Sequence, residues 1–113
     1  MIVATLWIGT QGGGLNKLTN KNQSFNHYSH SKNNPSSINA KSIWSLLKDS
    51  NNTLWVGTNT GGLNKYDDSS QKFTHFIHDK NNPNSISSNV VLSLLEDHKK
   101  RLWVGTYDGG LNL

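Results

Sequence analysis

The sequence predicts an all-β fold made of repeated four-stranded units, and two observations carry this prediction. The first is a repeat, because "LWIGT" at Leu6, "LWVGT" at Leu54 and "LWVGT" at Leu102 start 48 residues apart. Internal periods of about 20 to 50 residues indicate a repeat architecture. The second is that the segments between the turn signals are short and rich in alternating or β-branched apolar residues, as strands are.

The repeat extends over the whole unit. Aligning residues 6–53 with residues 54–101 without a gap gives 23 identities in 48 positions. The identities fall in blocks such as "LW.GT", "GGLNK", "KNNP" and "SLL.D". This pattern indicates a duplicated structural unit and not low complexity. The repeat units are therefore 6–53, 54–101 and a partial unit, 102–113.

Four expected strands make up one unit. The first is an apolar run that ends at an aspartate, and it recurs at 89–97. The second alternates, with Leu54 and Val56 on one face and Trp55 on the other. The third follows a Gly-Gly pair that can supply positive φ, and the fourth alternates again. In order, these strands are residues 42–49, 53–58, 62–67 and 72–78.

The connections decide the architecture. Short connections between these strands are typical of hairpins, and the longer segment 79–88 leads to the next unit. Four antiparallel strands and one longer crossing describe a β-propeller blade, which takes about 40 to 50 residues. The predicted fold is a partial β-propeller of about two and a half blades, with residues 1–113 as a single propeller segment. A helix over 89–100 is an alternative, although the β-branched pair and the short run favour a strand.

Repeated tryptophans and glycines have a structural interpretation. A single blade has two apolar faces that it cannot bury alone. We expect the tryptophans to fill the contacts between blades, with the middle one more buried than the other two. The glycines lie two residues further on the same strand face and leave room for them. These inter-blade residues are Trp7, Trp55, Trp103, Gly9, Gly57 and Gly105.

Two turn positions carry further expectations. Asp49 and Asp97 recur at the end of the first strand, and we expect them to cap the hairpins through Asx hydrogen bonds. Asn52 and Lys100 follow in these turns. Asparagine tolerates the left-handed conformation, whereas lysine does so less readily, so the last turn is predicted to differ in type.

The block "LWVGTNTGGLNKYD", with the strand pattern "SLL.D" ahead of it ("SLLKD" here and "SLLED" before the next copy) and "FTHF" behind it, resembles the two-component regulator propeller repeat. The resemblance covers essentially the whole chain, with three matches in register. It departs where Asn52 and Lys100 replace a usual glycine, and where "MIVAT" does not match "DSNNT". It implies the sensor region of membrane-spanning hybrid histidine kinases, which faces the periplasm and senses saccharides or related nutrients. A periplasmic or extracytoplasmic location is therefore expected, although "MIVAT" is too short for a signal peptide.

The resemblance implies a segment of a ligand-sensing β-propeller in a two-component system, detecting a saccharide or similar nutrient and not catalytic by itself. The alternative is a structural or protein-interaction propeller with no small-molecule ligand. A propeller lyase or hydrolase is weaker, because its catalytic residues would break the repeat. Candidate ligand-binding residues vary within the repeated frame, although loops also vary freely on fixed scaffolds. They are Asn59, Thr60, Tyr107 and Asp108, with Gln11 and Gly12 at the corresponding place.

Other chemistries find little support in the sequence. The formal net charge is +4, but Lys99-Lys100-Arg101 is the only basic cluster, whereas nucleic-acid binding needs a patch or stripe. Histidines three apart on a strand, His27 with His30 and His75 with His78, point to opposite faces and cannot share a metal ion. "GTQGGGLNK" lacks the phosphate-loop pattern, and the chain has no cysteine. We therefore expect no cofactor, no metal and no nucleic acid.

The expected partners are the remaining blades of the same propeller. Closed propellers typically have about four to eight blades, and both terminal blades here would expose an apolar face. The chain is thus expected to be a segment of a longer propeller. A homo-oligomer is not expected, because the strands at the two ends of the chain do not complement each other. Direct membrane contact is not expected either, since no stretch approaches about 18 apolar residues.

Overall fold

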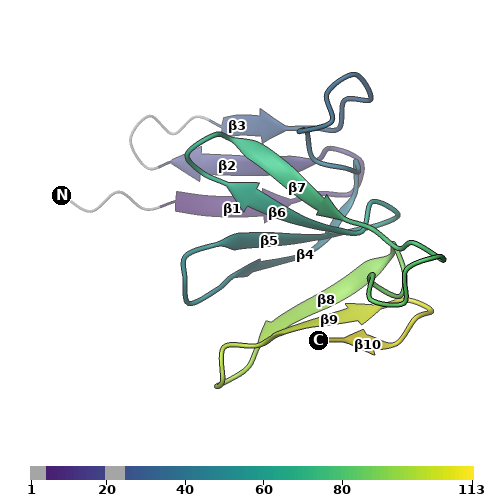
Figure 1. Ribbon diagram of the computed structural model, residues 1–113. Helices are drawn as coiled ribbons and strands as arrows, with labels where there is room; N and C mark the ends of the chain where they lie inside the picture. The colour runs from purple at the N-terminus through teal and green to yellow at the C-terminus, as the bar shows by residue number, and fades with distance from the viewer. Residues whose placement is uncertain (1–4, 20–24) are drawn as a thin grey trace.

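The computed structural model describes residues 5–19 and 25–113, and these residues form ten strands without any helix (Figure 1). The helix alternative for residues 89–100 is therefore wrong. The strands are β1 Thr5–Gly9, β2 Leu15–Thr19, β3 Phe25–Tyr28, β4 Ile43–Lys48, β5 Leu54–Thr58, β6 Leu63–Asp67, β7 Lys72–Phe76, β8 Val91–Glu96, β9 Leu102–Thr106 and β10 Leu111–Asn112.

Hydrogen bonding divides these strands into three antiparallel sheets. Their orders are β1-β2-β3, β4-β5-β6-β7 and β10-β9-β8. The middle sheet is the four-stranded unit predicted for residues 42–78. The sheets stack as separate layers, and β4 of the middle sheet lies beside β8 of the third (Figure 1). This arrangement confirms the predicted fold class, a partial β-propeller.

Each contact between sheets joins two different faces. In the first contact, the Trp7 face of the first sheet packs against the Val56 face of the middle sheet. In the second, the Trp55 face of the middle sheet packs against the Val104 face of the third. The first core contains Leu15, Ile38, Ile43, Leu54, Val56, Tyr66 and Phe73, with Trp7, Tyr28 and Leu46 against it. The second contains Leu63, Val91 and Val104, with Trp55, Ile86, Leu94 and Leu102 against it.

The repeated tryptophans lie at these contacts in different surroundings. Trp7 packs edge-on against Tyr66 of the next sheet, with ring centroids 5.1 Å apart. Trp55 lies 6.0 Å from Phe76 of its own sheet and also packs on the second core. Trp103 is paired with Leu95 on the outer face of the third sheet. All three are half-buried, and the expectation that Trp55 is more buried than the other two stays a prediction.

The indole N–H groups of Trp55 and Trp103 reach the polar turn at one end of their sheets, which keeps these rings half-buried. The Trp55 Nε1 donates to Asp49 Oδ2 at 2.8 Å, and the Trp103 Nε1 donates to Asp97 Oδ2 at the same distance. The Trp7 Nε1 is buried and has no partner among the described residues. The residue aligned with Asp49 is Met1, which lies outside the described residues.

The aspartates cap the hairpins as predicted. The Asp49 Oδ1 accepts hydrogen bonds from the backbone N–H groups of Asn51 and Thr53, both at 2.9 Å. At the equivalent turn of the third sheet, the Asp97 Oδ1 accepts hydrogen bonds from the backbone N–H groups of Lys99 and Arg101, at 2.8 and 3.0 Å. These Asx hydrogen bonds satisfy turn N–H groups that have no ladder partner.

The predicted difference between the two turns is not found. Asn52 has φ of 67° and Lys100 has φ of 62°, so both residues are left-handed. Each donates its backbone N–H to the carbonyl oxygen of the preceding aspartate at 2.9 Å. The aspartate's capping bonds and the closing backbone bonds fix the turn, and they override the weak preference of lysine against this conformation.

The strand glycines allow the sheets to approach each other. A Cβ atom on Gly57 would lie 2.7 Å from Val91 Cγ1 in the next sheet, and one on Gly9 would lie 2.5 Å from Ile43 Cγ2. Ordinary Cβ contacts are not this short. The space beside each glycine is therefore occupied by the first residue of the next sheet's first strand. A Cβ on Gly57 would also meet Ser45 of its own sheet, as a Cβ on Gly105 would meet Ser93, but the nearest atoms at Gly105 all belong to Ser93.

The two outer faces of the stack remain open in this chain. Leu6 and Phe25 of the first sheet are 55% and 47% exposed, whereas the aligned Leu54 and Phe73 are buried. On the third sheet, Leu111 is 67% exposed, and its aligned residues Leu15 and Leu63 are buried. The outer faces thus carry the same residue types that form the internal contacts.

We predict that Gly57→Ala lowers the free energy of unfolding by about 1–3 kcal/mol, because the new methyl group overpacks the contact with Val91. Urea unfolding of the purified chain measures the change. Gly105→Ala is the matched control at the same repeat position, and its methyl group meets only the movable Ser93 side chain. Equal losses for the two variants would contradict the role of Gly57 in the approach of the sheets.

The capped aspartates predict a loss of stability in acid. Hydrogen bonds from Trp103 and from the backbone of Arg101 hold the pKa of Asp97 well below its usual range. For Asp49, burial acts to raise the pKa, but hydrogen bonds from Trp55 and the turn outweigh it and lower the pKa. A depressed folded-state pKa stabilises the fold above the unfolded-state value of about 3.9, and this stabilisation is lost as the pH falls through the folded-state pKa.

We therefore expect the free energy of unfolding to fall below about pH 4 and Asp97→Asn to flatten this dependence. Thermal unfolding between about pH 2 and about pH 7, a range that brackets carboxylate titration, measures this dependence. Asp68→Asn is the control, because the Asp68 side chain is 82% exposed. If stability falls in acid as steeply in Asp97→Asn as in the unchanged chain, the turn carboxylates do not govern acid stability.

Candidate functional site

The candidate ligand-binding residues lie in the turns at one end of the sheets. Asn59 and Thr60 connect β5 to β6, and Tyr107 and Asp108 connect β9 to β10. The register places the start of β4 at this end, because Ile43 pairs with Thr58. We call this end of the stack the rim.

The structure brings two of the candidates to one place on the rim. Asn59 forms an isolated bridge with Val90, just before β8, and the backbone N–H of Tyr107 donates to the carbonyl oxygen of Val90 at 3.0 Å. The backbone N–H of Asn59 also donates to the carbonyl oxygen of Ser42 at 3.1 Å. The second and third sheets therefore present Asn59 and Tyr107 on either side of one residue.

These candidates differ in exposure. Tyr107 is 72% exposed, Thr60 and Asp108 are also exposed, and Asn59 is half-buried. An aromatic ring, an amide, a hydroxyl and a carboxylate are thus available to solvent within two adjacent turns. This set offers both hydrogen-bonding groups and an apolar surface, which is the usual composition of a ligand site.

Each rim turn is held by a repeated hydrogen bond. The Thr58 hydroxyl donates to the carbonyl oxygen of Gly62 at 2.8 Å, and Thr106 does the same with Gly110. Gly62 has φ of 74°, a left-handed conformation that favours glycine. The backbone N–H of Gly62 donates to Asn89 in the connection to the next sheet. The repeated "GT" and "GG" blocks therefore fix the shape of the turn, while the residues between them remain free to vary.

A buried asparagine joins the turn to the preceding connection. Asn64 is fully buried, and its Oδ1 accepts a hydrogen bond from the backbone N–H of Asn39 at 2.9 Å. Its Nδ2 donates to the carbonyl oxygen of Gly61 at 3.3 Å. Asn112 repeats the first bond with Ser87 at 3.1 Å. Sequence reasoning did not assign this role, although the repeated "GGLN" block carried the signal.

The backbone at Thr60 is strained. Its φ is 85°, close to the 88° of Gly12 at the same position of the first turn. A β-branched residue is an outlier in this region, and such strain costs on the order of 1–3 kcal/mol. Asp108 at the same position of the third turn does not have a left-handed φ. Strained residues of this kind cluster at functional sites, which directs attention to the turn of the middle sheet.

The histidines hold connections instead of converging on one another. The Nδ1 atoms of His30 and His78 lie 3.1 and 2.8 Å from the carbonyl oxygens of Ile38 and Ile86. The Nε2 of His75 is hydrogen-bonded to the carbonyl oxygen of Ser37. Within residues 5–19 and 25–113, no group of three or more His, Cys, Asp or Glu residues is arranged to hold a metal ion.

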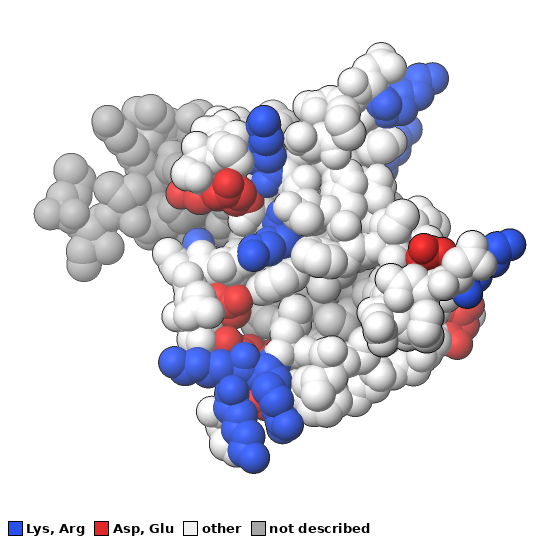
Figure 2. Space-filling view, in the orientation of Figure 1, with Lys and Arg blue, Asp and Glu red and all other residues white. Residues whose placement is uncertain are grey.

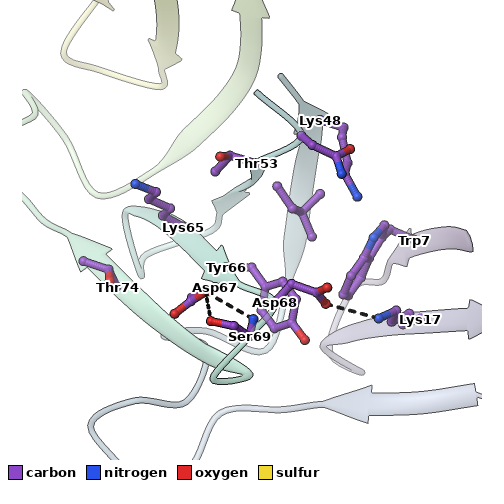
Figure 3. Close-up of a pocket in the computed structure, with 12 residues that line it drawn as sticks. Trp7, Lys17, Lys48, Thr53, Lys65, Tyr66, Asp67, Asp68, Ser69 and Thr74 are labelled. Atoms are coloured by element: carbon purple, nitrogen blue, oxygen red, sulfur yellow. Dashed lines mark hydrogen bonds and ion pairs between the residues drawn. The ribbon is translucent and has the colours of Figure 1, made fainter. Parts of the chain in front are cut away.

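A separate cleft of about 760 Å³ opens at the end opposite the rim (Figure 3). Some of its polar groups bind one another, since Lys17 pairs with Asp68 at 3.5 Å and Asp67 accepts hydrogen bonds from Ser69. None of the four ligand candidates lines it. Several of its residues, such as Trp7 and Lys17, are repeated frame positions. The rim is the stronger candidate, because its turns combine variable residues with backbone strain.

Positive charge does not mark a single binding surface. Figure 2 shows the Lys and Arg side chains of this face in separate groups, one of them over the β8–β9 turn, where Lys99, Lys100 and Arg101 lie. Arg101 is already engaged, because its Nε lies 2.7 Å from Asp97 Oδ2 and its guanidinium lies 5.5 Å from the Trp103 ring centre. Among the described residues, no helix is long and apolar enough to span a membrane.

The sequence matches the two-component regulator propeller family at residues 37–60 and 85–108. No curated protein matches the chain. Both matched segments contain the end of a connection, a first strand, the Asp-capped turn and a second strand. Each stops within the rim turn that carries the candidate residues.

Three solved structures with a similar fold come from B. thetaiotaomicron. The extracellular domain of BT4673 from B. thetaiotaomicron is similar in two structures, at 29% identity with TM-scores of 0.76 and 0.75; one is described as a one-component system and the other as a hybrid two-component system. The extracellular domain of the hybrid two-component system BT3049 is 28% identical, with a TM-score of 0.81. The alignments cover 95% of this chain and only 13% or 14% of those chains.

We predict that Thr60→Gly stabilises the chain by roughly 0.5–1 kcal/mol. Relief of the left-handed strain raises the free energy of unfolding by about 1–2 kcal/mol. The greater backbone entropy of glycine in the unfolded chain lowers it again by about 0.5–1 kcal/mol. Denaturant unfolding measures the difference. Asp108→Gly is the control without a left-handed φ and is expected to be neutral or destabilising. A loss of stability in Thr60→Gly would show that the turn is not strained.

Proposed function

Because residues 37–60 and 85–108 match the two-component regulator propeller family, we propose that this chain is part of the ligand-sensing propeller of a two-component signalling receptor. The proposed location is extracytoplasmic, in the periplasm. The similar structures from B. thetaiotaomicron are extracellular domains, which supports this location. The proposed role is recognition, with any phosphoryl chemistry in other parts of a longer receptor.

The proposed ligand is a saccharide or a similar nutrient, and the rim supports it most directly. Asn59, Thr60 and Asp108 supply the amide, hydroxyl and carboxylate groups that pair with sugar hydroxyls. Tyr107 supplies an exposed ring with an apolar face and a polar tip. The observation that supports this proposal most strongly is the turn at Thr60, which is strained and varies within an otherwise repeated sequence.

The proposed partners are further blades of the same propeller. The open outer faces carry residues whose aligned counterparts are buried at the internal contacts. Another blade would cover them in the same way that the middle sheet covers the first. The alternative, a protein-interaction propeller without a small-molecule ligand, would also bind further blades through these outer faces. It would not need a ligand site at the rim.

We expect an oligosaccharide to bind the chain and rim substitutions to weaken the binding. The chain is immobilised through a terminal tag, so that the open faces of neighbouring copies stay apart, and is exposed to malto-, xylo-, manno- and arabino-oligosaccharides. Tyr107→Ala and Asn59→Ala are each expected to weaken the binding about tenfold, equivalent to about 1.4 kcal/mol. His98→Ala in the turn at the opposite end is the control and is expected to bind like the unchanged chain.

If none of these oligosaccharides binds the folded chain at millimolar concentration, the saccharide proposal fails for this panel. That result would favour the alternative, a protein-interaction propeller without a small-molecule ligand. Binding that is equally strong in Tyr107→Ala and Asn59→Ala would move the site away from the rim.

A further inference from the structure

Trp44 is the one tryptophan of the four that does not belong to the 48-residue repeat, since Leu92 stands at the aligned position. It lies in β4, the first strand of the middle sheet, and its side chain is 41% exposed. Leu92 occupies the same place in β8 and is 42% exposed. The position is therefore exposed in both sheets, and only in the middle sheet does it carry an aromatic ring.

A β-bulge explains why this position is exposed. Ile43 pairs with Thr58 and Ser45 pairs with Gly57, which leaves Trp44 without an opposite residue. Such a bulge changes the direction of a side chain without ending the strand. The preceding Ile43 is buried in the first core, so the bulge separates Trp44 from the contact between the sheets.

The exposure of Trp44 does not come from an open end of the stack. The middle sheet is covered on one face by the first sheet and on the other by the third. Further blades beyond either end would not lie on the middle sheet. At the β4 edge of the middle sheet no further strand is paired, because β4 pairs with β5 alone, and β4 lies beside β8 of the next sheet (Figure 1).

Trp44 also lies near the rim. Ser42, two residues earlier, accepts the backbone hydrogen bond of Asn59 through its carbonyl oxygen. At about 3.3 Å per residue, Trp44 is roughly 7 Å along the strand from Ser42. Ser42, Asn59 and Thr60 at the rim of the same sheet carry no charge, and the charged Lys41 precedes Ser42 in the connection to β4. A large exposed indole beside uncharged amide and hydroxyl groups suits a ring with polar edges and an apolar face.

We propose that Trp44 stacks on an uncharged sugar ring at the β4 edge of the rim, with Asn59 and Thr60 of the same sheet binding its hydroxyl groups. This inference rests on the proposed saccharide function. It adds an aromatic platform that belongs to the middle sheet and distinguishes that sheet from its neighbour, where Leu92 offers no ring.

The test compares Trp44→Leu and Trp44→Phe with the unchanged chain, using the immobilised chain and the neutral oligosaccharides named above. Leucine is the residue that the repeat itself places at the aligned position, so the substitution keeps apolar bulk and removes the ring. We expect Trp44→Leu to weaken the binding of the oligosaccharide that the unchanged chain binds by at least about tenfold, and Trp44→Phe by less than about threefold. Leu92→Ala is the matched control and should leave the binding unchanged.

Tryptophan emission gives an independent readout. The sugar is expected to change the emission of the unchanged chain and not that of Trp44→Phe, which keeps Trp7, Trp55 and Trp103. Thermal unfolding of each variant checks the fold. Equal binding by Trp44→Leu, or an emission change that persists in Trp44→Phe, would overturn the inference and leave the proposed function standing. Equal loss in both variants together with a lowered Tm would show a structural role and also overturn it. An unchanged chain that binds none of the sugars would refute the proposed function itself.

Discussion

The close approach of the sheets at Gly9 and Gly57 is the constraint on which the rest of the structure depends. At each of these glycines the first strand of the next sheet comes so near that a methyl group would collide with Ile43 or Val91. This approach buries Val56 on one side of the middle sheet and Leu63 on the other. It also sets β4 beside β8, which positions the rim turns against the start of the following sheet. The apolar core and the candidate site therefore share one geometric cause.

The architecture could be predicted because the same strand pattern occurs in each copy of the repeat. A strand that alternates Leu54 and Val56 against Trp55 is ambiguous alone, but the same alternation at Leu102 and Leu6 removes the ambiguity. Asp49 and Asp97 likewise gave the turn, because an aspartate at a hairpin end has few other roles. The conformation of Lys100 was mispredicted for the opposite reason. The preference of lysine against a left-handed φ is small in energy, and the hydrogen bonds of Asp97 determine the conformation of the turn.

Features that depend on pairing register were beyond sequence reasoning. The bulge at Trp44 arises from a one-residue shift between β4 and β5, and no residue type announces it. The role of Asn64 depends on a partner 25 residues away in the connection before β4. The half-buried state of Trp55 follows from the turn carboxylate that binds its N–H group. The variable rim residues could be found from the repeat, whereas the strain at Thr60 needed the backbone itself.

The use of one pair of faces for every contact has an evolutionary consequence. Because the Trp7 face meets the Val56 face as the Trp55 face meets the Val104 face, a duplicated 48-residue unit finds a complementary surface wherever it is inserted. Gene duplication can then lengthen the array without inventing a new contact, in keeping with the nearest-neighbour character of repeat proteins. Selection can act on one rim turn at a time, since the side chains of Asn59 and Tyr107 belong to neither core and Asn59 joins the next sheet through its bridge to Val90. Recognition can thus diversify on a scaffold whose interior stays the same.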